Sequence, residues 1–181
     1  MNAQIKRLHP DAEIYSVHSE TLAMLNNTLL KRFLENYQRD DIKRTHLFNS
    51  RYENIYLDEQ HIAELSLLKN EAKNFANQIL GTEHIDMGFW FNYMPSGAVT
   101  TAHRHDDDDE LLSAAYYISV PKNSGDIILQ AKDAPLKITP SEGSFIFFKP
   151  NIVHEVTKNL SGQDRLSVGI NFGQRNKDSE D

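Results

Sequence analysis

Apolar residues recur at helical spacing in two stretches of the first half of the chain. After Ser19, a candidate helix cap, they share one face at Leu22, Leu25, Leu29 and Phe33, and this face is widened by Leu30, Leu34 and Tyr37. A second stripe follows Asp58, also a candidate cap, and stops before Gly81; its members are Ile62, Leu65, Leu68, Ala72, Phe75, Ala76 and Ile79. Each predicted helix has one apolar face, so each needs a flat surface to cover.

From Ile85 the pattern changes to short runs rich in β-branched and aromatic residues, separated by Pro, Gly and Ser. The predicted strands are 86–94, 98–103, 111–120, 126–130, 136–138, 144–149, 152–158 and 164–172. A further short strand is expected within 11–18, and the polar stretch 39–49 is expected to be a loop. This order predicts an α+β fold: a jelly roll, or double-stranded β-helix, of about eight strands with two N-terminal helices packed on one sheet.

The chain length favours one domain over residues 1–181, because a chain of this size buries roughly 70% of the surface that it exposes when unfolded. Within it we expect a mostly helical support region at 1–84, a jelly-roll core that carries the chemistry at 85–173, and a flexible acidic tail at 174–181.

Two of the predicted strands alternate in a way that suggests a cavity. In the last strand, Leu166, Val168, Ile170 and Phe172 share an apolar face, while Arg165, Ser167, Gly169 and Asn171 share the other. In the strand 111–120, small residues surround Tyr117 on one face, namely Ser113, Ala115 and Ser119. A half-exposed strand with Arg165 in water is the simpler interpretation, but small residues around one tyrosine also leave room for a ligand. Trp90, Phe145, Phe147 and Phe148 are expected to belong to the core.

Composition limits the kinds of metal site and partner that the chain can have. The chain has no cysteine, which excludes disulfides and thiolate-bound metals, so that a metal site must use His, Asp or Glu. The formal net charge of −7 argues against nucleic acid as a partner. No segment is apolar enough to be a leader or a membrane span, and we expect a soluble, cytoplasmic protein.

Three histidines are the candidates for a metal site. His103 and His105 are two positions apart, so on an extended segment they point to the same side, and His154 lies in the apolar run 152–156. Histidines in solvent are the ordinary alternative, but a ring buried among apolar residues needs a partner. Three imidazoles, or two with a carboxylate, can hold one face of a metal ion and leave positions open for ligands.

Residues 88–173 resemble the iron(II)- and 2-oxoglutarate-dependent dioxygenase superfamily, nearest to its prolyl-hydroxylase-like branch. The resemblance is carried by an ordered set of elements rather than by any one of them. These are Tyr93 ten residues before His103, the His103-x-His105 pair, and the segments 112–119, 124–129, 143–148, 154–156 and 165–167.

The resemblance implies cofactors and roles. The protein would bind Fe(II), with 2-oxoglutarate as cosubstrate and O2 as oxidant. His103 and His154 look like the first and the distal iron ligands. Arg165 would bind the far carboxylate of 2-oxoglutarate with help from Tyr117, a role that suits its planar guanidinium. Tyr93 would line the same cosubstrate pocket, with Ser167 and Asn171 around it.

One position departs from the family pattern. The family has a carboxylate where this chain has His105, and two arrangements are open: three histidines (His103, His105 and His154), or a site in which Asp107 replaces His105 as the third ligand. Spacing to the neighbouring segments favours His105.

The resulting hypothesis is an oxygenase that hydroxylates a protein side chain, of the prolyl type, or a small molecule. The substrate itself cannot be identified from the sequence. The alternatives are a cupin-like enzyme without 2-oxoglutarate and a non-catalytic jelly-roll binding or sensor protein. The acidic run 106–110 is either a solvated loop or a mouth that favours cationic substrates.

Overall fold

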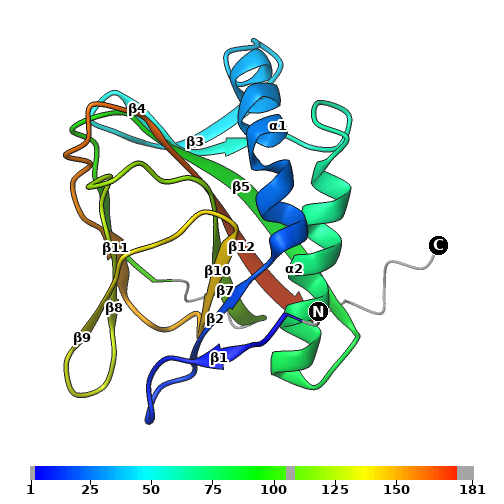
Figure 1. Cartoon of the computed structure of the whole chain (residues 1–181), viewed down its shortest axis with the longest axis vertical. Helices are drawn as coiled ribbons and strands as arrows, with labels where there is room; N and C mark the ends of the chain where they lie inside the picture. Colours follow the sequence, from blue (N-terminus) through cyan, green and yellow to red (C-terminus); the bar gives the residue numbers. More distant parts are fainter. Residues whose placement is uncertain (1–2, 105–108, 175–181) are drawn as a thin grey trace.

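The computed structural model describes residues 3–104 and 109–174 (Figure 1). Two helices occur, α1 (Glu20–Asn36) and α2 (Leu65–Leu80). The strands are β1 (Lys6–Arg7), β2 (Ile14–His18), β3 (Lys43–Phe48), β4 (Arg51–Tyr56), β5 (Ile85–Met94), β6 (Thr100–His103), β7 (Glu110–Ser119), β8 (Ile127–Gln130), β9 (Pro135–Ile138), β10 (Ser144–Phe148), β11 (His154–Val156) and β12 (Arg165–Gln174).

Two antiparallel sheets face each other. The larger has the order β1-β2-β10-β7-β12-β5-β4-β3, and the smaller has the order β6-β11-β8-β9. The sheets do not close into a barrel. The eight strands β5–β12 are the jelly roll that the sequence predicted, and the segment before them extends the larger sheet at both edges. Figure 1 shows α1 and α2 side by side on the outer face of this sheet, as their single apolar stripes required.

Alternation along the central strands separates two clusters of buried side chains. On the face towards the helices, Tyr116, Phe145 and Val168 belong to a large core that includes Phe33 of α1 and Phe75 of α2. On the opposite face, Tyr117, Ile146 and Phe148 pack with Ile127 and Leu129 of the smaller sheet. The second cluster is small, and it leaves a space between the sheets.

Helix boundaries were predicted well at three of four ends. Ser19 caps α1, since its side chain accepts a hydrogen bond from the Leu22 amide, and Gly81 ends α2 at a φ of 67°. The expectation that α2 begins after Asp58 is wrong, because α2 begins at Leu65. The Asp58 carboxylate instead accepts from the Gln60 amide and closes a separate turn.

The polar stretch 39–49 is not a loop throughout: β3 lies within it and pairs with β4. Asn49 and Ser50, with φ of 48° and 62°, form the two-residue connection, which fits the twist of a tight hairpin. The strand escaped prediction because β3 is the edge of its sheet and most of its side chains are exposed on both faces. Without a buried face, a strand shows no alternation of apolar and polar residues.

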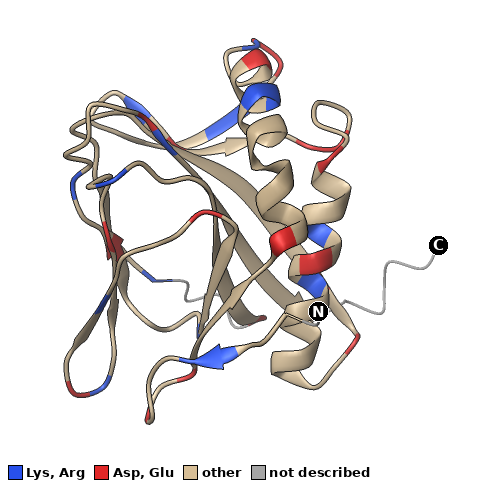
Figure 2. Cartoon of the chain, in the orientation of Figure 1, with Lys and Arg blue, Asp and Glu red and all other residues tan. Residues whose placement is uncertain are grey.

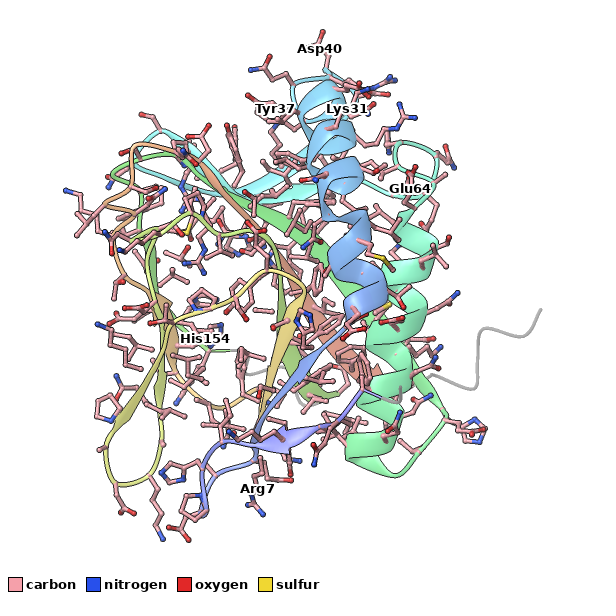
Figure 3. All side chains as sticks on the ribbon, viewed as in Figure 1. Arg7, Lys31, Tyr37, Asp40, Glu64 and His154 are labelled. Atoms are coloured by element: carbon pink, nitrogen blue, oxygen red, sulfur yellow. The ribbon has the colours of Figure 1, made fainter. Side chains whose placement is uncertain are left out.

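Charged residues of both signs are interspersed over the helices, the β3–β4 hairpin and the loops (Figure 2). Figure 3 shows His154 between the two sheets, whereas Lys31, Asp40 and Glu64 lie at the outside of the helical layer. No helix within the described ranges has the length and apolar character needed to cross a membrane.

Candidate active site

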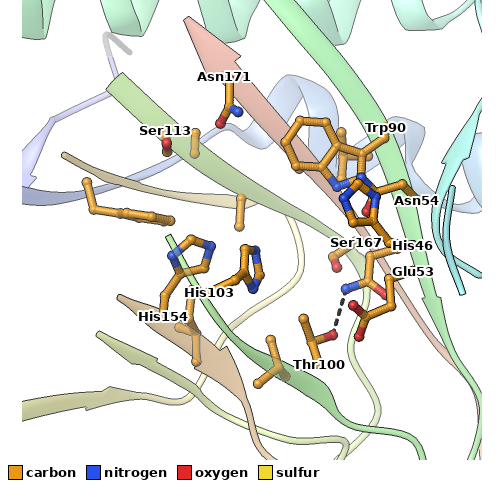
Figure 4. Close-up of a pocket in the computed structure, with 18 of the residues that line it drawn as sticks. His46, Glu53, Asn54, Trp90, Thr100, His103, Ser113, His154, Ser167 and Asn171 are labelled. Atoms are coloured by element: carbon orange, nitrogen blue, oxygen red, sulfur yellow. Dashed lines mark hydrogen bonds between the residues drawn. The ribbon is translucent and has the colours of Figure 1, made fainter. Parts of the chain in front are cut away.

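A cavity of about 490 Å³ lies between the two sheets. Its walls come from both sheets and from the β3–β4 hairpin, and its lining includes most of the residues singled out in the sequence: His103, Tyr117, His154, Arg165, Ser167 and Asn171. This volume is within the range of small-molecule sites. Figure 4 shows the cavity with His103 and His154 on one side and Trp90, His46 and Asn54 on the other.

The two described histidines form a pair across β6 and β11. His103 and His154 are register partners, and their ring centroids are 4.2 Å apart. His154 is buried, and its ring also contacts Phe148 at 4.7 Å between centroids. The pairing of two short strands therefore brings together residues that lie far apart in the sequence.

Backbone contacts fix the orientation of both rings. Nδ1 of His103 lies 2.8 Å from the Thr101 carbonyl oxygen, and Nδ1 of His154 lies 3.0 Å from the Ile152 carbonyl oxygen. A carbonyl oxygen only accepts hydrogen bonds, so each Nδ1 must donate. In the neutral ring this leaves Nε2 with its lone pair available to a metal, as in many histidine metal sites.

The third metal ligand cannot be placed. His105 and Asp107, the two residues considered for this position, lie outside the described residues. Over 3–104 and 109–174 no three His, Asp or Glu side chains form a group that could hold a metal ion. The described chain thus supplies two imidazoles, and the segment that follows His103 directly contains both remaining candidates.

Arg165 is a buried cation at one end of the cavity. It is 1% exposed, and its Nη1 donates to the carbonyl oxygens of Ser124 (3.3 Å) and Gly125 (2.6 Å). The guanidinium also lies over the ring of Tyr117, 5.4 Å from its centroid. Burial lowers the pKa of Arg165 from its ordinary value, but an arginine remains charged. No carboxylate of the described chain forms an ion pair with it.

Several buried polar atoms around Arg165 have no hydrogen-bond partner among the described residues. They are Nε of Arg165 itself, the hydroxyl of Tyr117 and the hydroxyl of Ser124. Burial raises the pKa of Tyr117 to about 12, so its hydroxyl stays protonated and is able to donate. Unsatisfied buried groups are costly, and the Arg165 guanidinium with two hydroxyls beside it has the donors that an anion requires.

At the Arg165 end of the cavity, the backbone of Gly125 packs closely against that of Thr157. A Cβ on Gly125 would overlap the carbonyl oxygen of Thr157 and would lie 3.3 Å from Nη1 of Arg165, and the φ of 105° also favours glycine. Ser124 and Gly125 were not assigned to the site from the sequence. The signals available were the Ser-Gly break before β8 and the segment 124–129 of the family resemblance, from which no site role was assigned to either residue.

Ser167, Gly169 and Asn171 follow Arg165 on the same face of β12, as the alternation predicted. Ser167 is buried and lines the cavity next to Arg165. Asn171 lies at the far end, where its Nδ2 donates to Oε1 of Glu110 (2.7 Å). Ser167 and Gly169 are register partners of Asn92 and Trp90 on β5, which line the same cavity.

Tyr93 does not line the cavity, which corrects the expectation for this residue. On β5 the residues that face the cavity are Trp90 and Asn92, and Tyr93 alternates to the helical side. Its ring packs against Phe33 and Tyr37 at 5.5 and 5.2 Å, and its hydroxyl donates to Asp164. Strand periodicity alone would have predicted this, because Tyr93 is on the same face of β5 as Phe89 and Phe91, which belong to the large core.

Trp90, which was expected in the core, is half-buried and lines the cavity. Phe148 is in the smaller core cluster, as expected, and also lines the cavity. The sequence reasoning also missed the β3–β4 hairpin, which contributes His46, Glu53 and Asn54 to the wall. Because the hairpin was not predicted, these three residues were not considered as part of the site.

Arg51 fastens the hairpin to the larger sheet. Its guanidinium donates to Oδ1 of Asn92 (2.9 Å) and to the carbonyl oxygens of Tyr93 (3.1 Å) and Val99 (2.6 Å), and it pairs with Glu53 at 3.2 Å. The wall opposite the histidines is therefore held by a partly buried polar network together with the packing of Ile55 in the large core.

Comparison of the sequence with protein families gives one match. The sequence profile of a family described as "Putative 2OG-Fe(II) oxygenase" matches residues 88–171, a segment that runs from β5 to β12 and contains all the cavity residues except those of the β3–β4 hairpin. No curated protein is similar enough in sequence to count as a relative.

Solved structures share the fold over nearly the whole chain. A Pseudomonas putida prolyl-4-hydroxylase is 19% identical with a TM-score of 0.71, covering 90% of this chain and 94% of its own. A Trichoplax adhaerens prolyl hydroxylase, solved with a peptide fragment of the hypoxia inducible factor oxygen degradation domain, is 17% identical (TM-score 0.69, 91% and 84% covered). EvdO2 from Micromonospora carbonacea var. aurantiaca is 12% identical (TM-score 0.73, 98% and 96% covered). At these identities the likeness shows the double-stranded β-helix fold.

Proposed function

The chain belongs to the iron(II)- and 2-oxoglutarate-dependent oxygenase superfamily, and we propose that it hydroxylates a C–H bond of a prolyl-type protein side chain or of a small molecule. The superfamily supplies the cofactors, which are Fe(II), 2-oxoglutarate and O2. We propose which residues hold these cofactors and which kind of substrate is hydroxylated. A protein substrate is favoured by the likeness to prolyl hydroxylases, one of which was solved with a peptide.

The observation that carries the proposal is the buried guanidinium of Arg165, which has no carboxylate within ion-pair distance among the described residues. Asp126 attracts it from farther away but forms its own ion pair with Lys137. A buried charge without a close partner is strongly unfavourable, which supports an anionic ligand at this position. With Tyr117 and Ser124 offering unused hydroxyls beside it, the site fits the far carboxylate of a dicarboxylate such as 2-oxoglutarate. A cupin-like binding protein would have no use for this arrangement.

The imidazoles of His103 and His154 fit an iron(II) ion. Nitrogen ligands suit this metal, and the Nδ1 contacts of both rings place the lone pair of the neutral imidazole on Nε2. We propose these two residues as ligands, with His105 as the third and Asp107 as its replacement. When bound, iron with 2-oxoglutarate supplies the oxidation of a C–H bond, in which one oxygen atom of O2 enters the product and the other enters succinate as carbon dioxide leaves.

The chain's own residues orient the reactants and exclude water. Arg165 holds one end of the cosubstrate, and Ser167 lies beside it on the same strand. Phe148 packs against His154, which keeps the ring in place and shields one side of the histidine pair. The apolar residues Ile127 and Val156 close the cavity from the smaller sheet. Both sheets wall the site, and of the histidine pair His154 is buried whereas His103 is exposed.

A matched pair of peptide pools tests the function. We expect the iron-loaded protein with 2-oxoglutarate and O2 to add one oxygen atom to members of a proline-containing pool, with one succinate formed per oxygen added. A pool in which alanine replaces proline serves as the control, and mass spectrometry with succinate quantification is the measurement. Oxygen added only to a pool of small metabolites would indicate a small-molecule substrate instead of a prolyl-type side chain. Failure of 2-oxoglutarate consumption with every pool would contradict the proposal.

A further inference from the structure

Arg51 joins three strands at the wall opposite the histidines. From β4 its guanidinium reaches Asn92 and Tyr93 on β5, and it also donates to the carbonyl oxygen of Val99 (2.6 Å), the residue directly before β6. The same guanidinium pairs with Glu53 at 3.2 Å, and the Arg51 side chain is only 14% exposed. Hydrogen bonds from a charged donor are stronger than those between neutral groups, so Arg51 ties the start of β6 to the larger sheet.

Asn92 extends this connection to the first residue of β6. Its Oδ1 accepts from Arg51, and its Nδ2 donates to Oγ1 of Thr100 (2.9 Å), the bond drawn beside Thr100 in Figure 4. Thr100 is buried, and its hydroxyl donates in turn to Sδ of Met94 (3.6 Å). Two adjacent positions at the start of β6 are thus held, one through the backbone and one through a side chain.

Because β6 is short, the place of its start determines the place of its end. It is four residues long, and its last residue is His103, roughly 10 Å of extended strand from Thr100. Thr100 pairs with Val156 and His103 pairs with His154, so three steps along β6 match two along β11. Such a bulge turns the side chains that follow it, and here residues three positions apart, Thr100 and His103, both line the cavity.

The loop before β6 has a second anchor that does not involve Arg51. The Gly97 amide donates to the carbonyl oxygen of Asn159 (2.7 Å), and the Asn159 amide donates to the carbonyl oxygen of Ala98 (2.9 Å). β6 itself is the edge of the smaller sheet and pairs there with β11. We therefore expect the chain to remain folded when Arg51 is replaced, with β6 held less firmly against the larger sheet.

We propose that Arg51 is a positioning residue for iron binding, which through the start of β6 sets the place of the His103 ring relative to that of His154. The inference rests on the proposed function, since it takes the two histidines as iron ligands. A planar guanidinium holds several acceptors in fixed directions, whereas the lysine ammonium is a point charge on a flexible stem. It is therefore the shape of the Arg51 side chain, and not its charge alone, that positions β6.

Arg51→Lys keeps the charge and removes the planar group. We expect it to weaken iron(II) binding about tenfold, as for other side chains that orient metal-binding histidines, and to shift the maximum of the visible charge-transfer band of the anaerobic iron(II)–2-oxoglutarate complex. Competition with a chelator of known affinity measures the first effect, and absorption spectroscopy measures the second. The affinity of the iron-free protein for 2-oxoglutarate depends on Arg165 and should be unchanged.

Arg44→Lys is the matched control on the same hairpin. The guanidinium of Arg44 donates to the carbonyl oxygens of Tyr37 (2.6 Å), Arg39 (2.9 Å) and Ile42 (3.2 Å), so these bonds tie the hairpin to the end of α1. Arg44→Lys should change neither the iron(II) affinity nor the band, even where both variants lower the Tm.

Thr100 offers a second pair of variants that leaves Arg51 in place. Thr100→Val removes the hydroxyl that accepts from Asn92, and it should weaken iron(II) binding in the same direction as Arg51→Lys. Thr100→Ser keeps the hydroxyl and should retain the wild-type affinity. This pair tests the same connection if Arg51→Lys does not fold.

Unchanged iron(II) affinity and an unchanged band in folded Arg51→Lys would overturn the proposal. Equal losses in Arg51→Lys and Arg44→Lys would show that only the stability of the hairpin matters, and equal affinities of the two Thr100 variants would show that the hydroxyl has no part; either result would also overturn it. A wild type that binds no iron(II), or a His103→Ala variant that keeps it, would instead defeat the proposed iron ligands, and these two proteins are measured first.

Discussion

Replacement of Arg165 by alanine is expected to weaken 2-oxoglutarate binding by about 2–5 kcal/mol, roughly 30-fold to several thousand-fold, while iron(II) binding is retained. The size follows from burial: the guanidinium is 1% exposed, so its attraction to a carboxylate is little screened by water. Isothermal titration of the iron-free and iron-loaded protein measures both affinities. Arg39→Ala removes an exposed arginine that pairs with Asp41, and this control should change neither.

The stability of the Arg165 variant separates loss of a contact from loss of the fold. Without ligand, Arg165 is a buried charge whose partners are two carbonyl oxygens and the Tyr117 ring. We therefore expect 2-oxoglutarate to raise the Tm of the wild type by mass action and to leave the Tm of Arg165→Ala unchanged. An equal ligand-induced rise in both proteins would show that the carboxylate binds elsewhere.

His103→Ala and His154→Ala are each expected to lose stoichiometric iron(II) and with it all turnover, while remaining folded. The two rings are held 4.2 Å apart, so removal of either breaks the pair. Iron content after desalting and circular dichroism are the measurements, and the exposed His84→Ala is the control. Unchanged iron in either variant would remove that histidine from the site.

The third ligand is decided by His105→Ala and Asp107→Ala measured side by side. If His105 binds iron, its removal should strip the metal, His105→Asp should keep it, and Asp107→Ala should have little effect. The opposite pattern would establish Asp107 as the ligand. Both candidates immediately follow His103, which the structure places in the cavity, so either is sterically reasonable.

The jelly roll was predictable because most of its strands bury at least one face, although β6 and β9 bury little. Burial forces alternation or a continuous apolar run, and the eight strands after Ile85 were found close to their true bounds. The β3–β4 hairpin lacks that signal, because its outer strand is the exposed edge of the sheet, and it was interpreted as a loop. What the sequence reasoning missed was thus an edge whose side chains are exposed on both faces.

The site residues, too, were predicted correctly where the alternation along a strand was followed. Arg165, Ser167 and Asn171 were placed on one face by alternation, and the structure brings all three to the cavity. Tyr93 was assigned by resemblance against its own alternation, and it lies on the other face. Trp90 could not be distinguished from a core residue by sequence. The space that admits its ring depends on Gly169, which lies 79 positions later in another strand. Pairing between distant strands is not visible in local patterns.

Anaerobic titration of the protein with iron(II) and 2-oxoglutarate tests the central claim most directly, which is that one cavity holds both through the histidine pair and Arg165. A weak visible charge-transfer band should appear only when both are present, because it requires the keto acid to be bound to the iron. The band should be absent from His154→Ala and should require far more 2-oxoglutarate in Arg165→Ala. No band from the folded wild type at saturating iron and 2-oxoglutarate, or a band with the same 2-oxoglutarate dependence in Arg165→Ala, would contradict the assignment of this site.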